Sequence, residues 1–270
     1  MIGVIVSSLL VITQTACVVP EEAISKGNII GLYGGYEVEP HSIPFQALLE
    51  SSDEYGDILC SGALISTNYV LTSAYCVYDL DNVTVYLGVH NRSEIDSSVQ
   101  TFVATELTYH ADYGFEGDYI VNDIGLIKLP EPAVLTSTVQ LASLITRADY
   151  ESNPNQGDIN VTISGWGRIG YDDEYSDVLL AGQRYISPIE ECASSDSLQL
   201  DQYICFPFKK DGTDVEGETG DTGDPLFKTV NGNRYIVALL STVETDDFEA
   251  DTNVGYYLDW IESNSDVKIN

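Results

Sequence analysis

Short runs that alternate apolar and polar residues dominate the chain, and they predict strands rather than helices. In "NVTVYLG", Val83, Val85 and Leu87 fall on one face of an extended segment. Residues 159–163 alternate in the same way, and the segment "RYIVALL" (234–240), apolar after its arginine, is typical of a strand buried on both faces. Gly, Asn and Asp turns separate these runs along the chain.

Only the end of the chain has the periodicity of a helix. In "NVGYYLDWIES", apolar residues recur at i, i+3, i+4 and i+7, namely Val254, Tyr257, Leu258 and Ile261. Many short strands followed by one terminal helix predict an all-β barrel or sandwich architecture.

The charge of the chain is strongly acidic. Eleven Lys and Arg against 43 Asp and Glu give a formal net charge of −32 over 270 residues. Nucleic acid and anionic membranes are excluded as partners, because both repel such a surface. The excess of negative charge favours solubility, and the alternative interpretation is that it attracts a basic protein or cations.

The N-terminal residues have the pattern of a secretory signal. Residues 1–17 combine an apolar stretch too short to span a bilayer with small residues at its end, although a basic start is missing. Residues 18–31 form a polar connector, and no second long apolar run predicts a membrane anchor. We therefore expect an extracellular protein.

Cysteines and glycosylation sequons agree with secretion. Cleavage near Ala16 or Cys17 leaves an even number of cysteines, as expected in an oxidising compartment: Cys60, Cys76, Cys192 and Cys205. Three Asn-X-Ser/Thr sequons predict glycans on surface loops: Asn82, Asn91 and Asn160.

One glycine-rich turn stands out chemically. Residues 220–225 read "GDTGDP" and present the hydroxyl of Thr222 between two carboxylates, just before an apolar strand. Such a turn is a candidate site for a nucleophile.

Several ordered motifs resemble the chymotrypsin-like (trypsin-like) serine proteases. They cover residues 32 to 262 and comprise "EPHSIPFQALL" (39–49), "CSGALISTNYVLTSAYC" (60–76), "NDIGLIKL" (122–129), "SGWG" (164–167), "GDTGDPLF" (220–227) and "YLDWI" (257–261). The segments "LGVHNRSE" and "TYHADY" are similar to the arthropod chymotrypsin and brachyurin branch. The resemblance implies a protease domain over residues 32–270, with two six-stranded antiparallel β-barrels, a cleft between them and a C-terminal α-helix.

The resemblance also implies a degenerate catalytic triad. Asp123 matches the family's aspartate, but Tyr75 stands at the histidine position and Thr222 at the serine position. A phenol with a pKa near ~10 offers no base at neutral pH. We expect Tyr75 to fill the cleft and donate its hydroxyl to Asp123, which would otherwise be a buried carboxylate without its imidazole partner.

No other histidine is expected to replace the missing base. His41, His90 and His110 fall on the outer surface in the family's layout, where solvent-facing side chains are expected. Loss of the nucleophile or the histidine alone costs a triad on the order of 10⁶ in turnover.

Other departures concern activation and substrate binding. In the family, cleavage after a basic residue frees a new N-terminus, which then pairs with an aspartate. The corresponding segment here, "LYGG" at 32–35, has no basic residue immediately before it, while Asp221 matches that aspartate. Asp224 replaces a glycine and adds charge to a crowded turn. Glu218 stands where the first cysteine of the specificity-pocket disulfide would be, while Cys60–Cys76 and Cys192–Cys205 remain as implied pairs.

Parts of the binding cleft are retained with changes. The resemblance assigns Gly220 and Asp221 to the oxyanion turn. It assigns the specificity-pocket wall to Ser241, Thr242 and Val243, where the branched Val243 narrows the mouth. The acidic loops 171–177 and 244–251 are expected at the cleft rim, either as solvated surface or as an exosite for a basic protein.

These observations predict a secreted, non-catalytic serine protease homologue that acts by binding as a decoy, cofactor or regulator. The expected partner is a protein, basic or related to proteases, and the chain is expected to be monomeric, without metal or cofactor. The alternative is a weakly active endopeptidase that uses Thr222. A third interpretation, an abundant storage-like protein, predicts no specific ligand.

Overall fold

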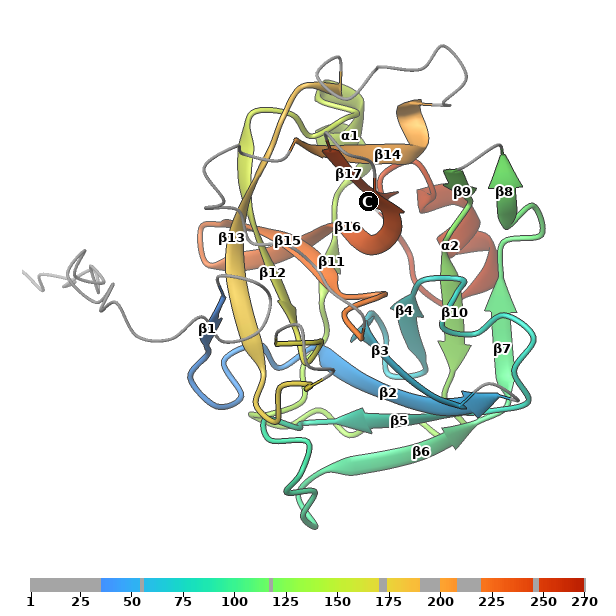
Figure 1. Ribbon diagram of the computed structural model, residues 1–270, viewed down its shortest axis with the longest axis vertical. Coiled ribbons are helices and arrows are strands. Elements are labelled where there is room, and N and C mark those ends of the chain that lie inside the picture. Colours follow the sequence, from blue (N-terminus) through green and yellow to red (C-terminus); the bar gives the residue numbers. More distant parts are fainter. Residues whose placement is uncertain are drawn as a thin grey trace, which may run out of the picture.

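The computed structural model describes residues 35–53, 56–116, 119–169, 174–189, 200–207, 220–244 and 248–269. The predicted signal segment 1–17 and connector 18–31 lie outside this part of the chain. In the described residues, most of the regular structure is β, and the chain folds into two curled, mainly antiparallel sheets (Figure 1).

The first sheet closes into a barrel. Its strand order is β6-β5-β2-β3-β4-β10-β7, with the strands β2 (Gln46–Asp53), β3 (Gly56–Leu64), β4 (Tyr69–Thr72), β5 (Val83–Leu87), β6 (Gln100–Ala104), β7 (Glu106–Tyr109) and β10 (Gly125–Lys128). The two ends of this order, β6 and β7, are separated by Thr105 alone. Counted as one interrupted strand, they close a six-stranded barrel, as expected.

The second sheet closes in a similar way. Its order is β1-β13-β12-β15-β16-β17-β14, with β11 pairing with β16. Its strands are β1 (Tyr36–Glu37), β11 (Ser143–Leu144), β12 (Ile159–Gly165), β13 (Leu180–Ile186), β14 (Tyr203–Pro207), β15 (Pro225–Val230), β16 (Asn233–Glu244) and β17 (Phe248–Asn253). A bridge between Ser187 and Cys205 joins the end of β13 to β14. Six strands therefore form this ring, and β1 and β11 are added to it.

Alternating burial explains why these segments are strands. In β5 the predicted inner residues Val83, Val85 and Leu87 are buried while the residues between them are partly exposed. Residues 236–240 in β16 are all buried, as the continuous apolar run predicts. A small separate ribbon pairs β8 (Gly114–Glu116) with β9 (Tyr119–Val121).

The predicted C-terminal helix is α2 (Leu258–Asn264), and its apolar residues Tyr257, Leu258 and Ile261 are buried. The sequence did not predict a second short helix, α1 (Arg147–Ser152), which begins where the Thr146 side chain accepts a hydrogen bond from the amide of Asp149. A 3₁₀ turn spans Leu200–Gln202.

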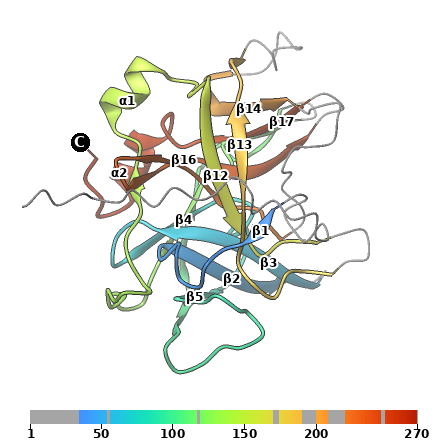
Figure 2. The same cartoon turned by 90° about the vertical axis from the view of Figure 1, so that its left-hand side faces the viewer.

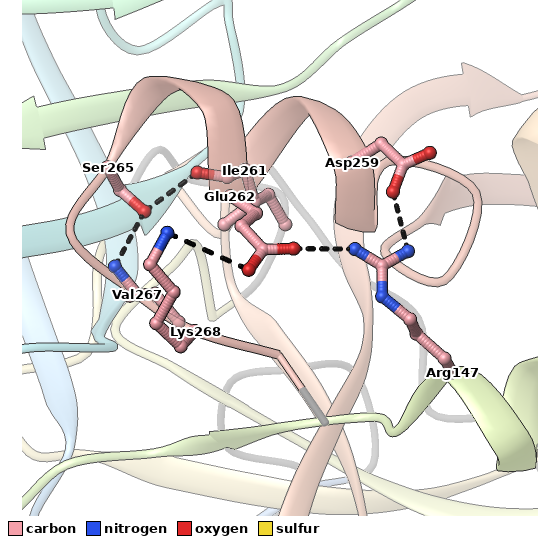
Figure 3. Close-up of polar contacts among 7 residues, drawn as sticks. All are labelled: Arg147, Asp259, Ile261, Glu262, Ser265, Val267 and Lys268. Carbon is pink, nitrogen blue, oxygen red and sulfur yellow. Dashed lines mark hydrogen bonds and ion pairs between the residues drawn. The ribbon is translucent and has the colours of Figure 1, made fainter.

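Arg147 connects the two helices, which lie on the same side of the molecule (Figure 2). Its guanidinium contacts Asp259 at 2.5 Å and Glu262 at 2.7 Å, and Lys268 approaches Glu262 at 3.7 Å (Figure 3). These exposed ion pairs link α1 to α2 and α2 to the chain that follows it, and pairs of this kind contribute little to stability.

Polar contacts join the two barrels near the turn at 220–224. Gln46 of β2 and Ser164 of β12 are hydrogen-bonded to each other through their side chains, at 2.8 Å. The amide of Ser61 in β3 donates to the carbonyl oxygen of Thr222 at 3.0 Å, and the amide of Gly223 donates to the carbonyl oxygen of Leu240 in β16. The turn is thus held from both sheets at once.

Candidate active-site cleft

Asp123 is buried between the two barrels and is fully engaged. The main-chain amide of Tyr75 donates to its Oδ1 at 2.9 Å, and the hydroxyl of Ser241 donates to its Oδ2 at 2.7 Å. Burial raises the pKa of Asp123 above its usual range, and the Tyr75 amide, the Ser241 hydroxyl and the Ala74 amide oppose this rise. The carboxylate therefore has donors without any imidazole.

The side chain of Tyr75 corrects one prediction. Tyr75 is 48% exposed, and the hydrogen bonds of the described residues do not include one from its hydroxyl to Asp123. The Tyr75 amide and the Ser241 hydroxyl each donate to one oxygen of Asp123, so this buried carboxylate has hydrogen-bond donors without the phenol. The ring points to the surface rather than filling the cleft as a partner of the aspartate.

Thr222 lies close to these residues, in a turn that requires glycine on both sides. Gly220 and Gly223 have φ angles of 94° and 84°, in the left-handed region that glycine adopts without strain. The Thr222 carbonyl oxygen lies 3.4 Å from Sγ of Cys76, next to Tyr75. The Thr222 side chain is buried, and its hydroxyl has no hydrogen bond among the described residues.

The two aspartates beside Thr222 are also buried. Oδ1 of Asp221 accepts a hydrogen bond from the amide of Gly167 at 2.7 Å, and Asp224 accepts one from Nε2 of Gln46 at 3.4 Å. Burial raises the pKa of Asp224 well above its usual range, and the neighbouring Asp221 raises it further. The expected additional charge at this turn is therefore placed inside the protein.

Three tyrosines, Tyr78, Tyr109 and Tyr113, form a cluster, and Tyr113 is close enough to Tyr75 for the two to interact electrostatically. Tyr78 packs edge-on against Tyr109 and Tyr113, with ring centroids 5.2 and 5.4 Å apart. Burial, Asp123 and Tyr75 together raise the pKa of Tyr113. We did not predict this cluster, although the spacing of tyrosines in "AYCVY" and "TYHADY" is a visible signal in the sequence.

The predicted pocket wall begins at Ser241, which is buried at the inner side of β16. Thr242 and Val243 continue this strand, and their side chains lie outside the described part of the structure. Glu218 also lies outside it. Gly220 and Asp221 lie in the turn beside Thr222.

A buried ionic cluster lies behind Ser241. Arg184 of β13 contacts Glu249 at 2.6 Å and Asp251 at 3.3 Å, and it lies over the ring of Phe206 at 3.8 Å. Oδ1 of Asp251 accepts a hydrogen bond from the amide of Ser241. This cluster corrects the prediction that loop 244–251 is acidic cleft rim, because Glu249 and Asp251 are buried within β17.

The other acidic loop is described only in part. Residues 171–173 lie outside the described residues, while Glu174 and Asp177 are exposed. Ser176 between them is buried, and its carbonyl oxygen accepts a hydrogen bond from Nε of Arg92 at 2.7 Å. This part of the loop is therefore fixed to the first barrel.

The three histidines have partners away from Thr222. His90 contacts Glu37 at 3.0 Å with its side chain 12% exposed, so it is largely buried rather than solvent-facing as expected. His41 is partly buried and its ring centroid lies 6.4 Å from that of His90. His110 packs against Tyr257, and burial lowers its pKa.

The disulfide between Cys60 and Cys76 is present, as the resemblance implies. Cys205 is disulfide-bonded, and its predicted partner Cys192 lies outside the described residues. Of the three sequons, Asn82 and Asn160 are exposed, and Asn91 is half-buried.

A groove of about 1250 Å³ opens beside Tyr78, between the end of the β2–β3 hairpin and the turn at 78–82. Five carboxylates line it: Glu50, Asp53, Asp57, Asp79 and Asp81. Arg92 also lines the groove, but its guanidinium is held by the Ser176 carbonyl oxygen and lies 5.8 Å from the ring centroid of Tyr175. The groove is therefore strongly acidic.

No group of three or more His, Cys, Asp or Glu in the described residues is placed to hold a metal ion. None of the helices in the same part of the chain is long and apolar enough to cross a membrane.

Comparison with known proteins places these features in a family. The Trypsin family model matches residues 32–261. Chymotrypsin from Phaedon cochleariae is 32% identical over 236 residues, covering 87% of this chain and 82% of the relative. Brachyurin from Leptuca pugilator is 33% identical over 242 residues, covering 87% and 99%. Granzyme B from Rattus norvegicus is 32% identical over 247 residues, covering 87% and 90%.

The similarity to an arthropod chymotrypsin and a brachyurin agrees with the prediction from the sequence motifs. The matched residues include both barrels and the first turn of α2. The chain therefore belongs to the trypsin family of chymotrypsin-like serine proteases.

Proposed function

We propose that this member of the family is a secreted, non-catalytic protein that acts by binding a protein partner. The observation that carries the proposal is Tyr75, which stands where the family has its imidazole, is 48% exposed and donates only its main-chain amide to Asp123 among the described residues. A triad needs an imidazole between that carboxylate and the nucleophile. Here the corresponding side chain is an exposed phenol, and the Thr222 hydroxyl has no base among the described residues.

A weakly active endopeptidase is the second candidate function. The glycine-flanked turn and the hydroxyl of Thr222 favour it, as do relatives named chymotrypsin and brachyurin. Without an imidazole, at most on the order of 10³–10⁴ over the uncatalysed reaction would remain from binding and oxyanion stabilisation.

Labelling with a fluorophosphonate probe and hydrolysis of a peptide library separate the two candidates. The natural protein, Thr222→Ala, Tyr75→His and the double variant Tyr75→His/Thr222→Ser are compared, each before and after limited proteolysis. We expect no labelling of the natural protein. Labelling of the natural protein that disappears in Thr222→Ala contradicts the proposal and establishes the endopeptidase.

The acidic groove supports a basic protein as the partner. In the described part of the chain, Glu50, Asp57, Asp79 and Asp81 take part in no ion pair with a Lys or Arg side chain. The aromatic ring of Tyr78 borders the groove and can contact a cation through its face. With a net charge of −32, long-range attraction also accelerates association with a basic ligand.

Binding of an oligo-lysine peptide tests the groove. In Asp79→Asn/Asp81→Asn we expect affinity to fall about 1.5- to 5-fold for each charge, as for exposed ion pairs. The matched control Glu131→Gln/Glu151→Gln removes two exposed charges outside the groove, and it keeps nearly the original affinity. Equal losses in both variants would contradict a specific groove and leave only attraction by net charge.

Secretion and a monomeric state are part of the proposal. The signal-like segment 1–17, the Cys60–Cys76 disulfide and the exposed sequons Asn82 and Asn160 support export and glycosylation. A storage-like protein, the third interpretation, would give no specific capture of a basic protein from its native fluid.

A further inference from the structure

The carboxyl groups of Asp221 and Asp224 meet inside the protein. Both residues are 0% exposed, and the two side chains lie within hydrogen-bonding reach of each other. No N–H or O–H donor of the described residues satisfies Oδ2 of Asp224. Two ionised carboxylates in contact without solvent repel each other strongly, so that such a pair keeps one proton.

The surrounding backbone is shaped to receive the pair. A Cβ atom at Gly165 would overlap the carboxyl group of Asp224, and one at Gly167 would overlap that of Asp221. The "SGWG" segment thus provides the two hollows that the carboxyl groups fill. The amide of Gly167 donates to Oδ1 of Asp221.

The turn that carries the pair connects the barrels. The amide of Asp224 donates to the carbonyl oxygen of Asp221 at 2.8 Å, and the amide of Leu240 in the second barrel donates to that of Asp224 at 2.9 Å. On the side of the first barrel, Gln46 donates to the Asp224 carboxyl and Ser61 donates to Thr222. A change in the protonation of the pair therefore affects hydrogen bonds to both sheets.

We propose that Asp221 and Asp224 hold a single proton between them and that this acid pair fixes the 220–224 turn between the barrels. While the proton is present, the protonated carboxyl donates to the ionised one. When the O–H bond breaks and the proton leaves to water, two carboxylates face each other and the turn loosens. The turn then responds to pH independently of whether Thr222 attacks any substrate.

Polar and charged groups of the described residues lie near the pair on both sides. Gln46 and Ser61 are the polar side chains from the first barrel. From the second barrel, the ring of Tyr175 lies against Gly220, and Arg168 follows Gly167 in the chain. Burial and Asp221 raise the pKa of Asp224, so that the protonated pair contributes stability that is complete at low pH and is lost as pH rises through the raised pKa.

Unfolding by urea as a function of pH tests the proposal in the full chain. In the natural protein, the unfolding equilibrium constant should rise with pH up to about tenfold per unit more steeply than in Asp224→Asn, because one proton is lost. An asparagine amide donates to Asp221 at every pH. The control Asp177→Asn removes an exposed carboxylate and should follow the natural protein.

Amide hydrogen exchange at Gly167 gives a second measurement, corrected for the intrinsic effect of pH. We expect its protection to fall with pH in the natural protein and to persist in Asp224→Asn. If Asp224→Asn does not fold, Asp221→Asn is used in its place, and it should likewise reduce the dependence of stability on pH. Parallel pH profiles for the natural protein and the folded variant would overturn the proposal.

Discussion

The main chain of Tyr75, rather than its side chain, contacts Asp123. The amide donates to Oδ1 at 2.9 Å, while Tyr75 as a residue remains 48% exposed. The residue at the histidine position therefore stabilises the buried carboxylate through a group that every amino acid except proline possesses. A change of the side chain at position 75 is consequently free of any cost to Asp123.

Tyr75→Phe follows directly from this relationship. Removal of the hydroxyl should change the free energy of unfolding by less than about 0.5 kcal/mol, as for other surface substitutions without a specific partner. Chemical denaturation measures the change. A loss above about 1 kcal/mol, typical of a hydrogen bond, would show that the phenol does contact a buried group such as Asp123.

Ser241→Ala removes a donor that the buried carboxylate needs. We expect a loss of about 1–3 kcal/mol at neutral pH, because Oδ2 of Asp123 is left without its partner. The Ser241 hydroxyl lowers the pKa of Asp123, which burial raises above its ordinary value of 3.8. The stabilities of the two proteins should converge at acidic pH, where Asp123 is protonated in both, and diverge as pH rises through this pKa.

Urea denaturation at several pH values checks this prediction. Ser152→Ala is the control, because its hydroxyl bonds only to a carbonyl oxygen within the exposed helix α1. A constant difference between the Ser241→Ala and natural proteins at all pH values would show that Ser241 does not interact with the charged form of Asp123.

Much of the fold could be predicted from local patterns. The alternation at Val83, Val85 and Leu87 and the terminal periodicity at Leu258 and Ile261 depend only on which face of an element is buried, and both are confirmed. The helix α1 has only six residues, too few to show a helical periodicity of apolar residues. The one feature of the sequence that indicates it is Thr146, which caps its N-terminus.

The candidate site was less predictable because its charges are buried. The sequence places Glu249 and Asp251 in an acidic stretch, and their partner Arg184 lies more than sixty positions earlier. Likewise, the Asp224 carboxyl is buried only because Gly165 leaves room for it. Local composition favours solvated surface or an exosite for 244–251 and only an added charge in a crowded turn for Asp224; the burial of these carboxyl groups depends on tertiary contacts over long sequence distances.

The Cys60–Cys76 disulfide should stabilise the region around Tyr75. It joins residues 16 positions apart, and a loop of this length corresponds to about 3 kcal/mol in the chain-entropy model. Cys60→Ser/Cys76→Ser should lower the stability by about that amount and speed exchange of the Tyr75 amide. If Tyr75 exchange is unchanged relative to that of Ile261 in α2, the disulfide does not position the Tyr75–Asp123 contact.

Arg184→Met should be among the most destabilising substitutions in the chain. It leaves Glu249 and Asp251 buried together without their cation, and removal of one partner of a buried ion pair costs about 3–5 kcal/mol. The substitution should also weaken the hydrogen bond that the Ser241 amide donates to Asp251. Thermal and chemical unfolding measure the loss.

The triple variant Arg184→Met/Glu249→Gln/Asp251→Asn tests whether that loss comes from uncompensated charge. Because neutral side chains need no cation, we expect it to recover most of the stability lost in Arg184→Met. The ring of Phe206 can then pack against methionine instead of the guanidinium. If the triple variant is no more stable than Arg184→Met, the contribution of Arg184 lies in its packing and not in its charge.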